Sequence, residues 1–79
     1  MGELKGYAIY YRIGNAHLAW GGRVEAEDEK QAFTQAKEMH KEMLQKFRDT
    51  ITEFYVEFDR DFKSYGFSKI NKRIIYENI

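Results

Sequence analysis

The sequence predicts a small two-layer α+β domain, in which a four-stranded antiparallel sheet carries one amphipathic helix on one face. Three observations lead to this prediction: an alternating apolar pattern before residue 27, a long apolar stripe with helical spacing after it, and further strand-like segments towards the end. The 79 residues leave room for one hydrophobic core. We therefore expect a single domain over residues 1–79.

A hairpin is predicted over residues 5–26. Residues 5–13 are rich in β-branched and aromatic side chains that alternate along a strand. Gly14-Asn15 follows, a pair that adopts the positive φ angles of tight turns. The second strand then alternates through Leu18, Trp20 and Val24. Gly21-Gly22 interrupts it, and we expect a bulge there or close packing under the helix.

One long helix is predicted from Asp28 to Arg48. Asp28 suits the N-cap, and Gln31 completes the spacing of a capping box. A helix of about 21 residues is roughly 31 Å long, whereas a strand of eight residues spans about 26 Å, so the last turn is expected to overhang the sheet. The apolar stripe consists of Ala32, Phe33, Ala36, Met39, Met43, Leu44 and Phe47.

Two more strands are predicted after the helix. Residues 53–59 alternate strictly, with Phe54, Val56 and Phe58 on the apolar side. Residues 59–68 are interpreted as a connection with room for one helical turn before Gly66. Residues 69–79 are β-branched and form the fourth strand, in either of two registers. The order is ββαββ, and a right-handed crossover then predicts the sheet order 2-1-3-4.

One helix covers only one face of such a sheet, so the other face is expected to be open to solvent or to a partner. The predicted open face carries Tyr10, Arg12, Ala19, Arg23, Tyr55 and part of the last strand. Tyrosines exposed on a sheet are typical of contact surfaces. The sequence thus favours a non-catalytic protein–protein interaction module that binds another protein, or itself as a homodimer, through this face or an edge strand. The candidate binding residues are Tyr10, Arg12, Arg23 and Tyr55.

The sequence shows no catalytic residue set, so we expect no enzyme, cofactor or small-molecule substrate. The chain has no cysteine, and its serines and threonines have no histidine and acid in a known local signature. Gly21-Gly22 lacks the spacing of a phosphate-binding loop. No metal site is expected either, because His17 and His40 lie on different elements and Asp59 with Asp61 reads as a solvated strand end.

The alternative is a single-stranded nucleic-acid-binding domain. It would use the basic, aromatic end of the chain, through Lys63, Tyr65, Lys69, Lys72 and Arg73. Against it, the formal net charge is zero and acidic residues flank the cluster. A weaker possibility is an accessory subunit that docks on a larger enzyme through Phe47 at the helix overhang. No apolar stretch of membrane-spanning length or signal-peptide type is present, so the expected location is cytoplasmic.

The ββαββ order in fewer than eighty residues, with an acidic N-cap and a Gln31-Ala32-Phe33 helix start, resembles small phage and mobile-element proteins. Some of those inhibit host defence systems, anti-CRISPR proteins among them. The resemblance is one of architecture and transfers no motif. It implies a role as an inhibitor or adaptor.

Overall fold

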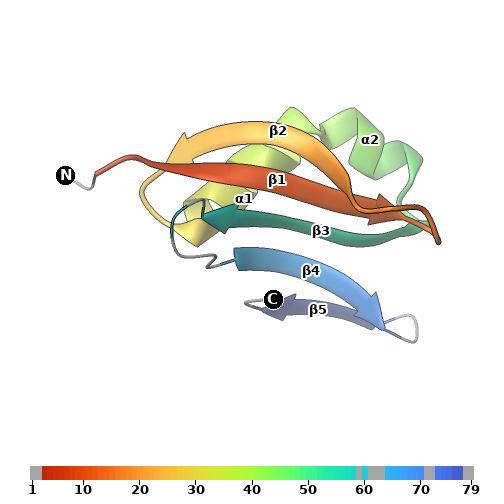
Figure 1. Cartoon of the computed structure of the whole chain (residues 1–79). Coiled ribbons are helices and arrows are strands. Elements are labelled where there is room, and N and C mark those ends of the chain that lie inside the picture. The colour runs from red at the N-terminus through yellow and green to blue at the C-terminus, as the bar shows by residue number, and fades with distance from the viewer. Residues whose placement is uncertain (1–2, 59, 61–63, 71–72, 78–79) are drawn as a thin grey trace.

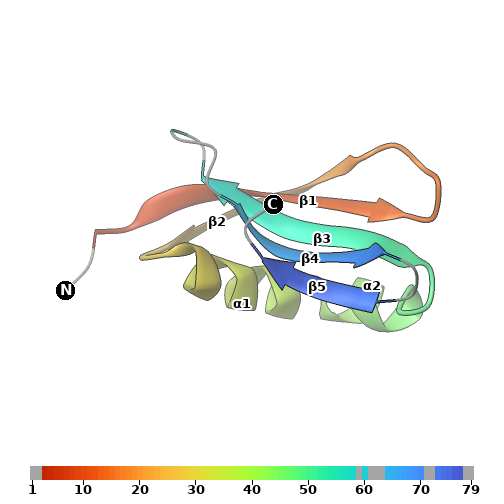
Figure 2. The ribbon, with the colours of Figure 1, turned by 90° about the horizontal axis from the view of Figure 1, so that it is seen from below.

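The computed structural model of the chain describes residues 3–58, 60, 64–70 and 73–77, with the backbone alone for 68–70 and 73–77 (Figure 1). These residues form an antiparallel sheet of order β2-β1-β3-β4-β5, and both helices lie on one side of it (Figure 2). The predicted α+β architecture and the order 2-1-3-4 are confirmed, and the sheet continues into a further strand. The elements are β1 (Lys5–Ile13), β2 (Ala19–Ala26), α1 (Glu29–Met39), α2 (Lys41–Lys46), β3 (Ile51–Phe58), β4 (Ser64–Ile70) and β5 (Arg73–Glu77).

The core lies between the helices and the central strands. Phe33 of α1 is at its centre, with ring centroids 5.9 Å from Phe54 and 5.3 Å from Tyr65. Ala32 and Ala36 flank Phe33 and are completely buried, so their small side chains bring α1 close to the sheet. The sheet side of the core includes Tyr7, Ile9, Val24, Ala26, Ile51, Phe54, Val56 and Phe67. The apolar alternation predicted for the first and third strands is thus confirmed.

The predicted hairpin of β1 and β2 is present, with a connection longer than a tight turn. It spans residues 14–18 and begins at Gly14, which has a φ of 60°. Gly21-Gly22 forms a bulge opposite Ile9, because Ala8 pairs with Arg23 whereas Tyr10 already pairs with Trp20. Gly22 has a φ of 103°, a conformation that favours glycine.

This bulge corrects the predicted faces of β2. The extra residue reverses the in–out alternation on its far side. Ala19 therefore lies opposite Tyr11 on the side of the helices, and not on the open face where the sequence placed it. Trp20 lies opposite Tyr10 on the open face, although the alternation of the sequence grouped it with Val24 of the core.

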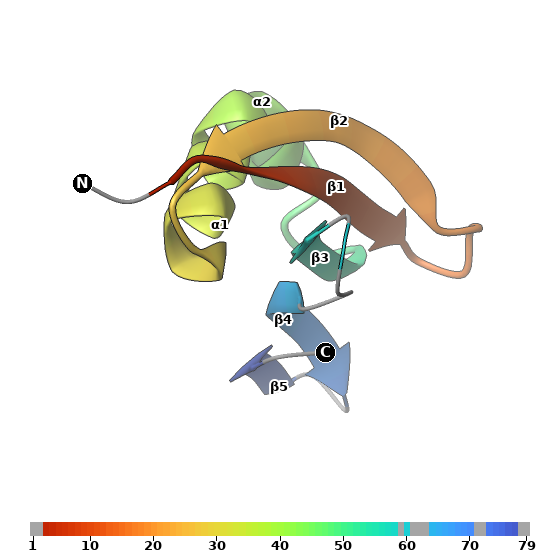
Figure 3. The same cartoon turned by 60° about the vertical axis from the view of Figure 1, so that its left-hand side comes forward.

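The prediction of one continuous helix to Arg48 is wrong, because the helix breaks at His40. Asp28 is the N-cap as predicted, and its Oδ1 accepts a hydrogen bond from the Gln31 amide at 2.8 Å. The Nε2 of His40 donates to the carbonyl oxygen of Gly21 at 2.6 Å, which ties this point of the helix to β2. β2 arches past the helices (Figure 3), and the break at His40 separates α1 from α2. Phe47 accordingly packs against the core and does not overhang.

The end of the chain also differs from the prediction. Residues 64–68, interpreted as a connection, belong to β4. Of the predicted fourth strand, residues 69–70 also belong to β4 and residues 73–77 form β5, while 71–72 and 78–79 lie outside the described residues. Gly66 does not stop a helix. It lies in β4 opposite Tyr55, where an added Cβ would overlap the Phe54 carbonyl oxygen and the Tyr55 Cβ. Tyr65 and Phe67 alternate with Ser64, Gly66 and Ser68, and these small residues carry little strand propensity, which is why the strand pattern is weak.

Candidate functional site

The face of the sheet turned away from both helices (Figure 2) is here called the open face. The strand registers place a row of aromatic residues on it. The backbone register aligns Trp20 of β2 with Tyr10 of β1, Tyr10 with Tyr55 of β3, and Tyr55 with Gly66 of β4. We call Trp20, Tyr10 and Tyr55 the aromatic row. The rings of Tyr10 and Tyr55 lie 5.6 Å apart at an interplanar angle of 30°. Trp20 is 63% exposed, so the row ends in a large apolar surface in contact with solvent.

Charged residues flank the aromatic row on both sides. On one side, Nε of Arg12 donates to Oε2 of Glu53 at 2.6 Å, across the β1–β3 pair. On the other side, Ala8 lies between Arg23 of β2 and Glu57 of β3. Ala8 is only 6% exposed, as expected for a small side chain between two long ones. The cations Arg12 and Arg23 therefore belong to β1 and β2, whereas the anions Glu53 and Glu57 belong to β3.

The environment of Tyr55 keeps its hydroxyl protonated. Partial burial raises the pKa of this phenol, and the negative charges of Glu57 and Glu53 raise it further, while Arg12 opposes them. The hydroxyl is neutral at physiological pH and can both donate and accept hydrogen bonds. The row combines apolar rings with polar tips, which is the composition found at the centre of protein interfaces.

The structure brings the four predicted binding residues onto one surface. Tyr10, Arg12 and Tyr55 are immediate neighbours there, and Arg23 lies in the adjacent row. Sequence reasoning missed Trp20, the most exposed large ring of this surface. The sequence signal that bears on Trp20 is the Gly21-Gly22 pair, which indicates a bulge but does not say how many extra residues the bulge contains. A single extra residue moves every position beyond it to the opposite face.

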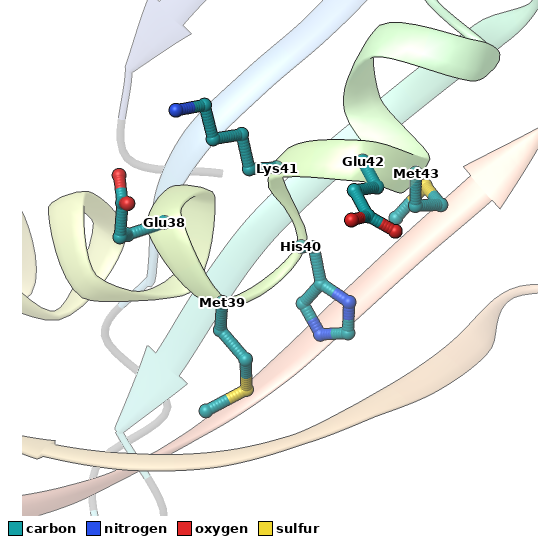
Figure 4. Close-up of a pocket in the computed structure, with 6 residues that line it drawn as sticks. All are labelled: Glu38, Met39, His40, Lys41, Glu42 and Met43. Carbon is teal, nitrogen blue, oxygen red and sulfur yellow. The ribbon is translucent and has the colours of Figure 1, made fainter.

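A depression of about 440 Å³ lies at the junction of the helices and is lined by residues 38–43 (Figure 4). His40 and Met39 point to the side of β1 and β2, whereas Glu38 and Lys41 point to the other side. The imidazole of His40 is held by Gly21 and lies beside the rings of Tyr11 and Phe54, at 6.1 and 6.0 Å. These contacts give His40 a structural role at the helix break.

The residues of the nucleic-acid alternative are only partly described. Tyr65 packs edge-on against Phe33 on the helix side, so its ring is not part of the open face. Lys63 and Lys72 lie outside the described residues, and only the backbone of Lys69 and Arg73 is described. Asp59 and Asp61 also lie outside, and no group of three His, Cys, Asp or Glu residues suited to a metal ion occurs in the described part.

No protein-family model, curated protein or solved structure gave a significant match to this chain. Within the described ranges, none of the helices has the length and apolar character needed to cross a membrane.

Proposed function

We propose that this chain is a non-catalytic protein-interaction module that binds its partner through the open face. The observation that carries the proposal is the aromatic row, in which an exposed tryptophan and two tyrosines with neighbouring, tilted rings lie in register across three strands. Tryptophan, tyrosine and arginine dominate the binding energy of protein interfaces, and all three meet on this face. A binder of this size would act as an inhibitor or adaptor, by occupying a surface of a larger protein.

The charges of the open face favour a protein over a nucleic acid. Arg12 is already paired with Glu53, and Glu57 adds a further negative charge beside the row. A polyanionic strand on the aromatic row would meet both carboxylates, whose repulsion opposes phosphate binding. A protein surface of mixed charge meets no such penalty, and alternating charges give it orientation.

Differential capture tests this proposal. The wild-type domain and a Trp20→Ala, Tyr55→Ala double variant are immobilised and exposed to nuclease-treated lysate of the cells that express the chain. We expect a set of proteins to be retained by the wild type and reduced at least about tenfold on the variant, because the anchor rings of an interface supply most of its affinity.

Met39→Ala is the matched control, since Met39 is a large apolar side chain that is 54% exposed on the helix side. It should retain the same proteins as the wild type. Circular dichroism verifies that each variant is folded. Equal retention by all three proteins would refute the open face as the surface that binds the captured proteins. A parallel capture from untreated lysate completes the test, because proteins retained only without nuclease would assign the face to nucleic acid.

A further inference from the structure

We infer that the occupant of the open face is a second copy of this chain, related to the first by a two-fold axis that runs along the strands between β1 and β3. The inference rests on the proposed function, because it uses the same face, and it adds the partner and the geometry. A two-fold interface must be self-complementary, so each group on the surface has to meet a suitable group of the same surface after rotation.

The charge pattern fits this rotation. Turning a second copy about the axis places its β3 over β1 of the first copy, and its β1 over β3. Arg12 of each copy then faces Glu53 of the other, so that the ion pair seen within one chain becomes part of an alternating network of four charges. Arg23 lies beside Ala8, four residues from Arg12 along β1, and the rotation brings Glu57 of the second copy over Ala8, next to Arg23.

The aromatic row fits the same rotation. The tyrosine pair lies on the axis, so Tyr10 of one copy meets Tyr55 of the other and the four rings form one cluster. Trp20 on β2 is carried over β4, where the register places Gly66. The largest side chain of the aromatic row thus faces Gly66, a buried position beside the row that has no side chain.

The other in-plane two-fold axis does not fit. An axis along the aromatic row would place each strand over the same strand of the second copy. It would also exchange the row of Arg12 and Glu53 with the row of Arg23, Ala8 and Glu57. Glu53 would then face Glu57 of the second copy, and Arg12 would face Ala8. Like charges that meet in an interface cost affinity, whereas the axis along the strands brings opposite charges together. Charge complementarity therefore selects the first axis.

The area of the open face limits the expected affinity of the dimer. Four strands of about eight residues present an area of about 19 by 26 Å, or about 500 Å² per copy, less than the roughly 800 Å² per partner of a stable complex. Two such sheets pack about 10 Å apart as a sandwich. We therefore expect a dimer with a dissociation constant in the micromolar range, visible only at high concentration.

Sedimentation equilibrium between about 10 μM and about 1 mM is the first measurement, a range that spans micromolar affinities. The mass should rise from monomer to dimer over this range. Trp20→Ala should raise the dissociation constant at least about tenfold, while Met39→Ala on the helix side changes it less than about twofold. A mass that stays monomeric at about 1 mM would overturn the dimer, as would a dimer that Trp20→Ala leaves intact.

A charge swap tests the axis itself. The double variant Arg12→Glu, Glu53→Arg keeps a pair of opposite charges across β1 and β3 and remains complementary to its own copy under the proposed axis. Mixed with the wild type, it would place like charges opposite each other. Native mass spectrometry of the ¹⁵N-labelled variant mixed with unlabelled wild type should show both homodimers, with the mixed dimer at least about fivefold below its statistical share.

A statistical share of the mixed dimer would overturn this axis. The differential capture described above remains a separate test, because it records proteins other than this chain. Loss of captured proteins on the Trp20→Ala, Tyr55→Ala variant, together with a monomeric wild type, would remove the dimer and leave the proposed function. Unchanged capture, together with a wild-type dimer and a depleted mixed dimer, would restrict the open face to self-association.

Discussion

Gly66 decides how closely β4 approaches β3. It pairs with Tyr55, and the backbone around Phe54 and Tyr55 occupies the space that a Cβ would need. A side chain there would displace the main chain itself, which cannot move as freely as the end of a flexible side chain. The glycine thereby keeps β4 in register with Tyr55. It also leaves the position beside Tyr55 in β4 without a side chain.

We expect Gly66→Ala to lower the free energy of unfolding by about 2–3 kcal/mol, because the added methyl overlaps backbone atoms. Gly14→Ala is the comparison. Gly14 has a φ of 60° with open space around its Cβ position, so alanine there suffers only the backbone cost, about 1 kcal/mol. Urea unfolding followed by circular dichroism measures both. A loss at position 66 no larger than that at position 14 would contradict the close approach.

Among single residues, the sequence correctly predicted that Tyr10, Arg12 and Tyr55 are neighbours on one face. The prediction succeeds because β1 pairs regularly with β3 between Tyr10 and Arg12. It could not place Trp20. The glycines after it were recognised as the mark of a bulge, but the reversal of faces depends on how many residues oppose Ile9 across the pair, which is a property of the folded sheet.

Among the elements, the helix break at His40 has the clearest cause. Gly21 has no side chain, and a Cβ there would lie 3.2 Å from Nε2 of His40 and 3.0 Å from Ile9. Gly21 therefore leaves room for the imidazole of His40 to reach the carbonyl oxygen of Gly21 itself. The bulge in β2 and the break between α1 and α2 therefore meet in this one contact between Gly21 and His40.

Removing this contact should destabilise the domain. We expect His40→Ala to cost about 2 kcal/mol in the free energy of unfolding, through the lost hydrogen bond and the lost packing against Tyr11 and Phe54. His40→Phe keeps a ring without the donor and should cost about 1 kcal/mol. The exposed neighbour Lys41 provides the control, and Lys41→Ala should change stability by less than about 0.5 kcal/mol. If His40→Ala matches this control, the anchoring role is wrong.

The sequence predicted the start of the helix but not its break. The cap at Asp28 is a local signal, since the hydrogen bond joins residues three apart. The break depends on Gly21, nineteen residues away, and the apolar stripe continues through it without a change of spacing. The division of the last strand was missed for a related reason. Glycine and serine have low strand propensity, so β4 is defined by its pairing with β3.

For the whole molecule, β1 and β3 form the best-buried pair of strands. Each has a strand neighbour on both sides and contributes completely buried residues to the core, whereas β2 has one strand neighbour. Both central strands meet at Ile9 and Val56, which are paired and fully buried. The open face is built mainly on these two strands, so the proposed binding surface coincides with the most protected part of the sheet.

Amide hydrogen exchange tests this hierarchy. We expect the amides of Ile9, Val56 and their neighbours in β1 and β3 to exchange only through global unfolding, while about half of the β2 amides, which point away from β1, exchange at least about a hundredfold faster. A dimer through the open face leaves the outer edge of β2 unpaired, so the exchange of those amides should stay the same between dilute and concentrated samples. If their protection instead increased with concentration, the copies would be joining edge to edge through β2, and the two sheets would form one continuous sheet instead of a sandwich.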